Sequence, residues 1–127
     1  MTDELAALIE LIGKSGFMVH AFRGDRHGPE GLAAVRDLGG CVDVMILFDE
    51  DRACAYRAPR APGVDPFAPS QVYWSYASSA VWTLRALLTL AAPGHPEAPT
   101  ELTAAPAGLG VPTEWRERVR VRKRTRC

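Results

Sequence analysis

The sequence has little of what several specialised protein classes require. Its three cysteines, Cys41, Cys54 and Cys127, have irregular spacing, which fits neither a disulfide framework nor a zinc motif. The longest apolar run, residues 80–92, contains an arginine and is shorter than the ~20 residues of a membrane-spanning helix. The first residues are acidic, whereas a signal peptide begins with positive charge. We therefore expect reduced thiols, no membrane span and a cytoplasmic location.

Catalytic and nucleotide-binding motifs are also missing. The sequence has no Gly-x-Ser-x-Gly elbow, no Gly-x-Gly-x-x-Gly, no complete Gly-x-x-x-x-Gly-Lys-Ser/Thr phosphate loop and no Cys-x-x-Cys pair. Cys41 and Cys54 fall in two predicted strands, where a cysteine usually serves as a small buried apolar side chain. We expect no cofactor, and the sequence leans away from an enzyme.

The composition is that of one globular domain. The chain has 127 residues, of which 47% are hydrophobic and 24% are charged, which excludes disordered, collagen-like and coiled-coil classes. Thirteen of the fifteen basic residues are arginine and alanine is abundant, as in proteins of high-GC bacterial genomes.

The zero net charge conceals an uneven distribution. Residues 113–127 carry a net charge of +5 and residues 1–112 a net charge of −5. Residues 118–122 alternate Arg and Val, which is the period of a strand. We expect this tail to form an edge strand, in this chain or a neighbour's, to contact nucleic-acid phosphates, or to contact anionic lipid. Its candidate contacts are Arg116, Arg118, Arg120, Arg122, Lys123, Arg124 and Arg126.

Apolar spacing predicts three helices. Leu5, Leu8, Ile9 and Ile12 form one stripe of a first helix that begins after Thr2. A second helix is predicted from Pro29 to about residue 38, and a third from a Ser78 or Ser79 cap to about residue 91.

The predicted strands are residues 17–23, 41–48, 52–58 and 71–76. The first is apolar on both faces, as expected of a central strand. It would lie parallel to residues 41–48, because a short crossover helix would connect the two. Residues 41–48 and 52–58 form a hairpin that turns at residues 49–51 and places Cys54 opposite Ile46.

These elements predict an α+β fold in the order α-β-α-β-β-β-α. We expect a small mixed sheet of four to five strands with three helices mainly on one face, forming a compact domain over residues 1–92. Residues 93–112 contain five prolines and are predicted to form an extended arm. Residues 113–127 are the basic tail.

One candidate chemical site follows from this topology. The loop at residues 23–28 would meet the turn at residues 49–51 where ligands bind in open α/β sheets. Carboxylates and imidazoles there could hold a divalent metal or exchange protons. The candidate residues are Asp25, His27 and His20 for catalysis, and Asp25, His27, Asp49 and Asp51 for a metal. The alternative, which we favour, is a pair of solvated turns.

Aromatic residues cluster between residues 73 and 82 and are expected to belong mostly to the core. Where they remain exposed they indicate an interface, because Trp, Tyr and Arg are the usual anchors of binding surfaces. The candidate partner-binding residues are Trp82, Arg85 and Tyr73, with Arg85 one helical turn from Trp82.

Asp43 falls on the same strand face as the apolar Met45 and Leu47. A carboxylate buried there requires a partner, and Arg57 or a tail arginine could supply it. The alternative is that this face is partly open to water.

Three functional hypotheses remain. The first is a small non-enzymatic interaction or accessory protein that forms a homo-oligomer or joins a complex. The second is a nucleic-acid-binding regulator that uses the basic tail. The third is a small metal- or anion-dependent enzyme that uses the loop at residues 23–28 and the turn at residues 49–51.

Overall fold

A five-stranded sheet forms the centre of the molecule. The computed structural model describes residues 3–23, 29–112 and 115. The described helices are α1 (Asp3–Lys14) and α2 (Ala80–Leu88). The strands are β1 (Met18–Arg23), β2 (Pro29–Asp37), β3 (Cys41–Asp49), β4 (Arg52–Pro59), β5 (Gln71–Val72), β6 (Trp74–Ser78) and β7 (Thr103–Ala104).

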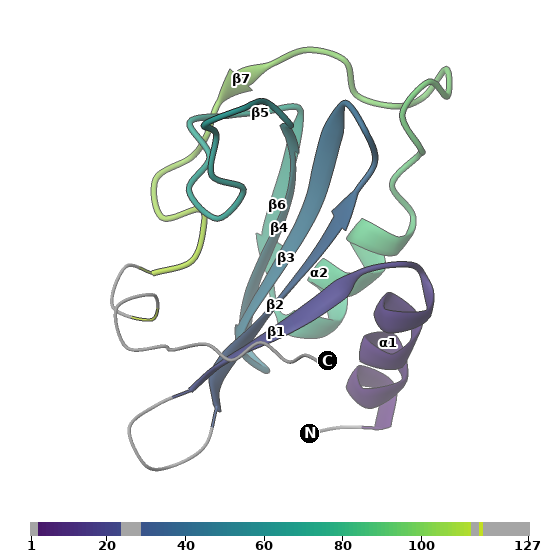
Figure 1. Ribbon diagram of the computed structural model, residues 1–127. Helices are drawn as coiled ribbons and strands as arrows, with labels where there is room; N and C mark the ends of the chain where they lie inside the picture. Colours follow the sequence, from purple (N-terminus) through teal and green to yellow (C-terminus); the bar gives the residue numbers. More distant parts are fainter. Residues whose placement is uncertain (1–2, 24–28, 113–114, 116–127) are drawn as a thin grey trace, which may run out of the picture.

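The sheet is antiparallel throughout, with the strand order β1-β2-β3-β4-β6. Both helices lie against one of its faces, and the arm that follows α2 crosses the other face (Figure 1). We call these the helix face and the arm face. At one end of the molecule β5 pairs with β7, which attaches the arm to the segment before β6.

The helix face carries the first hydrophobic core. Alternate residues of β3 and β4 point to this face and pack on the apolar sides of the two helices, since successive strand residues point to opposite faces. Its fully buried members include Ile12, Met45, Ala55, Leu84 and Leu87.

The arm face carries a second core. Val44, Ile46 and Tyr56 are completely buried beneath the loop and the arm. The Tyr56 hydroxyl donates a 2.5 Å hydrogen bond to the Pro66 carbonyl, which fastens the loop before β5 to the sheet. The sheet is thus covered on both faces although it is antiparallel.

Trp115 closes the second core at the start of the basic tail. Its ring lies 5.6 Å from the Phe22 ring and 5.4 Å from the Phe48 ring. Gly31 permits this approach, because a Cβ there would lie 2.2 Å from the Trp115 ring and 2.6 Å from the Leu47 carbonyl oxygen.

Several predictions about the sheet and helices were wrong. Residues 29–37 form β2 and not a helix, so two helices are described in place of three. The described sheet is antiparallel and not mixed. Residues 18–23 form an edge strand and not a central one, with Met18 66% exposed. β1 and β3 do run in the same direction, but β2 lies between them because it pairs antiparallel with both.

Other predictions were confirmed. The first helix buries Leu5 and Ile12 as its spacing indicated. The hairpin of β3 and β4 places Cys54 opposite Ile46, and both Cys41 and Cys54 are free and buried. The Ser79 side chain caps α2 by accepting a hydrogen bond from the Trp82 N–H. The α+β class is therefore correct at the level of its strands and helices.

No helix in the described ranges is long and apolar enough to cross a membrane.

Candidate protein-binding surface

A buried ion pair fixes the relation between the sheet and the helices. Asp43 and Arg57 lie opposite each other on β3 and β4, with exposures of 0% and 1%. Arg57 donates to both oxygens of the Asp43 carboxylate, through Nε at 2.6 Å and Nη2 at 2.9 Å. Hydrogen bonding to Asp43 raises the pKa of the Arg57 guanidinium. The sequence left open whether the Asp43 carboxylate is buried with a partner or faces water. It is buried, and its partner is Arg57.

A second arginine joins this pair and connects it to the helix ends. Arg36 donates to the Asp43 carboxylate at 3.2 Å and to the Ser15 carbonyl, just after α1, at 3.1 Å. Arg57 donates to the Ala91 carbonyl, after α2, at 2.8 Å. Two guanidinium groups share the one Asp43 carboxylate, so one positive charge is not neutralised by it. Carbonyl groups near helix ends carry partial negative charge and help to offset that charge. This network ties the chain just beyond each helix to the sheet.

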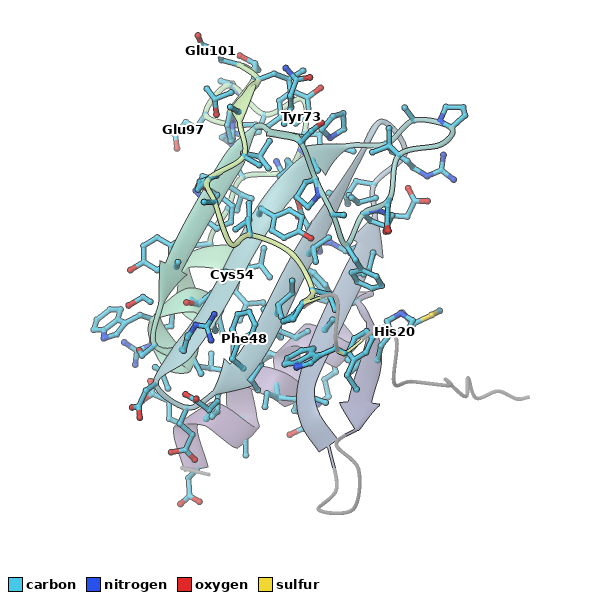
Figure 2. The ribbon with its side chains drawn as sticks, turned by 90° about the vertical axis from the view of Figure 1, so that its left-hand side faces the viewer. His20, Phe48, Cys54, Tyr73, Glu97 and Glu101 are labelled. Atoms are coloured by element: carbon cyan, nitrogen blue, oxygen red, sulfur yellow. The ribbon has the colours of Figure 1, made fainter. Side chains whose placement is uncertain are left out.

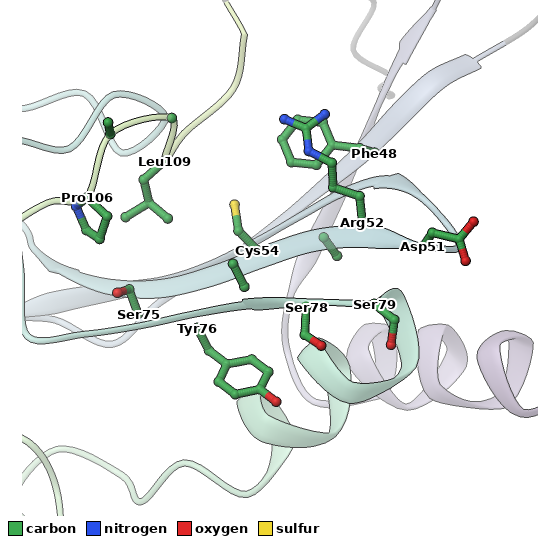
Figure 3. A pocket seen from close by; sticks show the side chains of 14 residues that line it. Phe48, Asp51, Arg52, Cys54, Ser75, Tyr76, Ser78, Ser79, Pro106 and Leu109 are labelled. Carbon is green, nitrogen blue, oxygen red and sulfur yellow. The ribbon is translucent and has the colours of Figure 1, made fainter.

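Strand β6, at one edge of the sheet, carries exposed aromatic side chains. Tyr76 pairs with Ala55 and therefore points to the helix face, where its ring stacks on Trp74 with centroids 6.4 Å apart. Tyr76 is 38% exposed. Figure 3 shows its ring projecting toward the side of the strand on which α2 lies.

Helix α2, which begins two residues after β6 ends, carries an exposed tryptophan. The buried residues of α2 are Ala80, Thr83, Leu84 and Leu87, and the 3.6-residue period places Trp82 on the opposite side of the helix from them. Trp82 is 57% exposed, more than the other tryptophans.

Arg85 lies on the outer surface of the same helix. It ion-pairs with Glu4 of α1, and its guanidinium carbon is 5.0 Å from the centre of the Trp82 ring. The cation therefore limits the freedom of the indole while both side chains remain open to solvent. We call Tyr76, Trp82 and Arg85, with the outer edge of β6, the β6 flank.

A cavity opens along β6 on the arm face. Its volume is about 690 Å³. Strand β6 contributes Ser75 and Ala77, and the arm overhangs it with Pro106 and Leu109. In the close view, Leu109 lies above Cys54, and the edge of the cavity is formed by β6 (Figure 3). The edge strand thus has aromatic rings on one side and a cavity on the other.

The cavity contains a cation and a thiol. Arg52 stacks on Phe48, with its guanidinium carbon 4.0 Å from the ring centre. Cys54 is buried, and that burial raises the pKa of its thiol. A raised pKa keeps the thiol protonated at neutral pH and makes it a poor nucleophile. Cys54 therefore lacks the lowered pKa of an activated thiol.

The residues of the predicted chemical site are only partly described. Asp25 and His27 lie outside the described residues, as does the loop that would contain them. His20 is exposed on β1, 5.8 Å from the Phe67 ring. Asp49 ends β3 and Asp51 lies in the β3–β4 turn, where the Asp51 N–H donates to the Asp49 carboxylate at 2.8 Å. Within the described ranges no group of three or more His, Cys, Asp or Glu side chains could hold a metal ion.

The predicted nucleic-acid contacts lie outside the described residues. They are Arg116, Arg118, Arg120, Arg122, Lys123, Arg124 and Arg126. The aromatic residue of the tail is Trp115, which is buried with 7% exposure. It is therefore not available to stack on a base.

The partner-binding candidates divide between two places. Trp82 and Arg85 lie together on the β6 flank. Tyr73 is half-buried at the break between β5 and β6, where its N–H donates to the Arg57 carbonyl at 2.7 Å. Figure 2 shows Tyr73 at the β5 end of the sheet and Cys54 nearer its middle. Tyr76 is the exposed aromatic residue of β6 and stacks on Trp74; only the alternation along β6 could have indicated it.

No protein-family model, curated protein or solved structure matches this chain.

Proposed function

We propose that this chain is a non-enzymatic interaction protein that binds another protein chain through the β6 flank. The observation that carries the proposal is the exposure of Tyr76, on the edge strand β6, and of Trp82, in the helix that directly follows this strand. Large aromatic side chains with an adjacent arginine are the usual anchors of protein interfaces. Burying them on a partner removes apolar area from water, at roughly 25 cal/mol per Å².

The rest of the molecule supports this role. The buried residues of α2 pack in the first core, and Arg57 holds the Ala91 carbonyl after the helix, so α2 presents Trp82 from a fixed position. A fixed aromatic anchor loses little conformational entropy on binding, which favours affinity. The buried Cys54 thiol, with its raised pKa, gives little support to covalent catalysis.

Photocrosslinking tests the proposal. A benzophenone amino acid is placed at position 82 or at position 102, in the full chain expressed in its source cells. Leu102 is a matched control because it is 39% exposed and lies on the arm, away from α2. The proposal predicts a discrete crosslinked product at position 82 and none at position 102. Equal crosslinking at both positions, or none at position 82, contradicts it.

A further inference from the structure

We propose that the β6 flank binds an extended segment of a partner protein, which joins the sheet as an additional strand beside β6. That segment carries large apolar side chains at every second position and an acidic residue at one end. This inference rests on the proposed function and specifies the conformation and chemistry of the partner.

The outer side of β6 is suited to strand addition. Strand β6 ends the sheet, so within the described residues no strand pairs with its outer side. An edge strand presents alternate N–H and C=O groups that another strand can bond. Proteins usually protect such edges with lysine, proline or a bulge. Residues 74–78, Trp-Ser-Tyr-Ala-Ser, contain neither a charge nor a proline, and their pairing with β4 is regular.

The surroundings of β6 match the alternation of an added strand. Side chains of a strand point alternately to the two faces of a sheet. On the arm face they would enter the 690 Å³ cavity between Ser75, Ala77 and Leu109. On the helix face they would lie against the exposed ring of Tyr76. Strand addition gains affinity from main-chain hydrogen bonds and specificity from pockets that take alternate side chains.

The size of the cavity favours a partner segment over a second copy of β6. If two copies of the chain paired through their β6 strands, each copy would turn its own Ser75 and Ala77 to the arm face. The other copy would therefore offer only these small side chains to the cavity. A cavity of this size holds about 20 waters at roughly 30 Å³ each, so these small side chains would leave most of it unfilled. Two or more large apolar side chains on one face of a strand would fill it better.

The positive charge of Arg52 in the cavity is the reason for expecting an acidic residue in the partner segment. Arg52 is the cation among the residues that line the cavity, and it has no carboxylate within 4.0 Å in the described part of the chain. Asp51 lines the same end, but its carboxylate points away from the cavity (Figure 3). A glutamate in the added strand near Ser78 could meet the Arg52 guanidinium, which is exposed and able to turn from Phe48.

Peptide selection tests this proposal on the full chain. A phage library of random nonapeptides is selected against the protein, and the enriched peptides are synthesised. We expect alternating apolar residues with an acidic residue near one end. Fluorescence anisotropy then compares Ala77→Lys with Ala21→Lys, since both alanines are exposed on edge strands. Lysine at position 77 should weaken binding at least tenfold, and lysine at position 21 should change it less than twofold. No enrichment, or equal binding by both variants, overturns the proposal.

Amide hydrogen exchange provides a test that needs no variant. In the free protein the outward amides of residues 74–78 should exchange rapidly at every concentration, and the enriched peptide should protect them. Protection that rises with concentration, together with a dimeric mass in light scattering, means that a second copy occupies the edge and overturns the proposal. Protection in the free monomer means that another part of this chain covers the edge, which also overturns it.

The two proposals fail in different ways. A crosslink at position 82 without peptide enrichment leaves the proposed function intact and refutes strand addition. Absence of the crosslink at position 82 refutes the proposed function itself.

Discussion

Replacing Asp43 by asparagine should destabilise the fold more than the same replacement at an exposed aspartate. Asp43→Asn keeps the size of the side chain but leaves Arg57 buried without a counter-charge. Breaking one side of a buried ion pair costs about 3–5 kcal/mol. We expect the lower end, about 3 kcal/mol, because the Ala91 and Ser15 carbonyls still accept from the two arginines.

This loss corresponds to a large change in melting temperature. An unfolding entropy of about 2.1 cal/mol/K per residue gives roughly 0.27 kcal/mol/K for a chain of this length. Asp43→Asn should therefore lower Tm by about 10 °C. Differential scanning calorimetry and urea denaturation of the full chain measure the two quantities independently.

Asp37→Asn is the matched control. Asp37 pairs with Arg60 at 2.7 Å, but the two side chains are 52% and 56% exposed. An exposed pair contributes about 0–1 kcal/mol. The double variant Asp43→Leu/Arg57→Met should regain most of the stability lost in Asp43→Asn, because β3 and β4 then carry no unpaired buried charge. Arg36 loses its carboxylate, but its side chain is 29% exposed and still donates to the Ser15 carbonyl. Equal losses in Asp43→Asn and Asp37→Asn would refute the role of the buried network.

Two further predictions concern glycine and cysteine. Gly31→Ala should cost about 1–3 kcal/mol through overpacking against Trp115, whereas Gly13→Ala, with open space in α1, should stabilise by about 0.5–1 kcal/mol; urea denaturation measures both. In a Cys41→Ala/Cys127→Ser background, Cys54 should react with a thiol reagent only as fast as the protein unfolds. Because burial raises its pKa in the folded state, its contribution to stability is present below the ordinary thiol pKa of about 8.5 and declines as pH rises above it. Rapid labelling of the folded protein at pH 8 would contradict this.

The elements predicted correctly from the sequence are those with an unambiguous period. In α1 the apolar residues occur at helical spacing, and in β3 valine, isoleucine and phenylalanine alternate on one face. Strand β2 lacked such a signal. Its Ala33 and Ala34 are both completely buried, on opposite faces, so no polar residue alternates with an apolar one there. The spacing of Leu32, Val35 and Leu38 then resembled a helix.

The surface depends on contacts that local patterns do not encode. Trp82 and Arg85 were found because their spacing places them on one side of a helix. The cavity could not be predicted in this way, because it forms only when Leu109 of the arm packs above Cys54 of β4, more than fifty residues away in the sequence. The exposure of Tyr76 likewise follows from the position of β6 at the end of the sheet.

The most direct test of the binding role is the dissociation constant of the complex with the protein that crosslinks at position 82. Calorimetric titration should show that Trp82→Ala weakens this complex by about 30-fold, as the loss of about 2 kcal/mol at an interface anchor implies. Leu102→Ala should change the constant by less than twofold. A Trp82→Ala variant that binds the partner as tightly as the unaltered chain would contradict the assignment of the β6 flank as the binding surface.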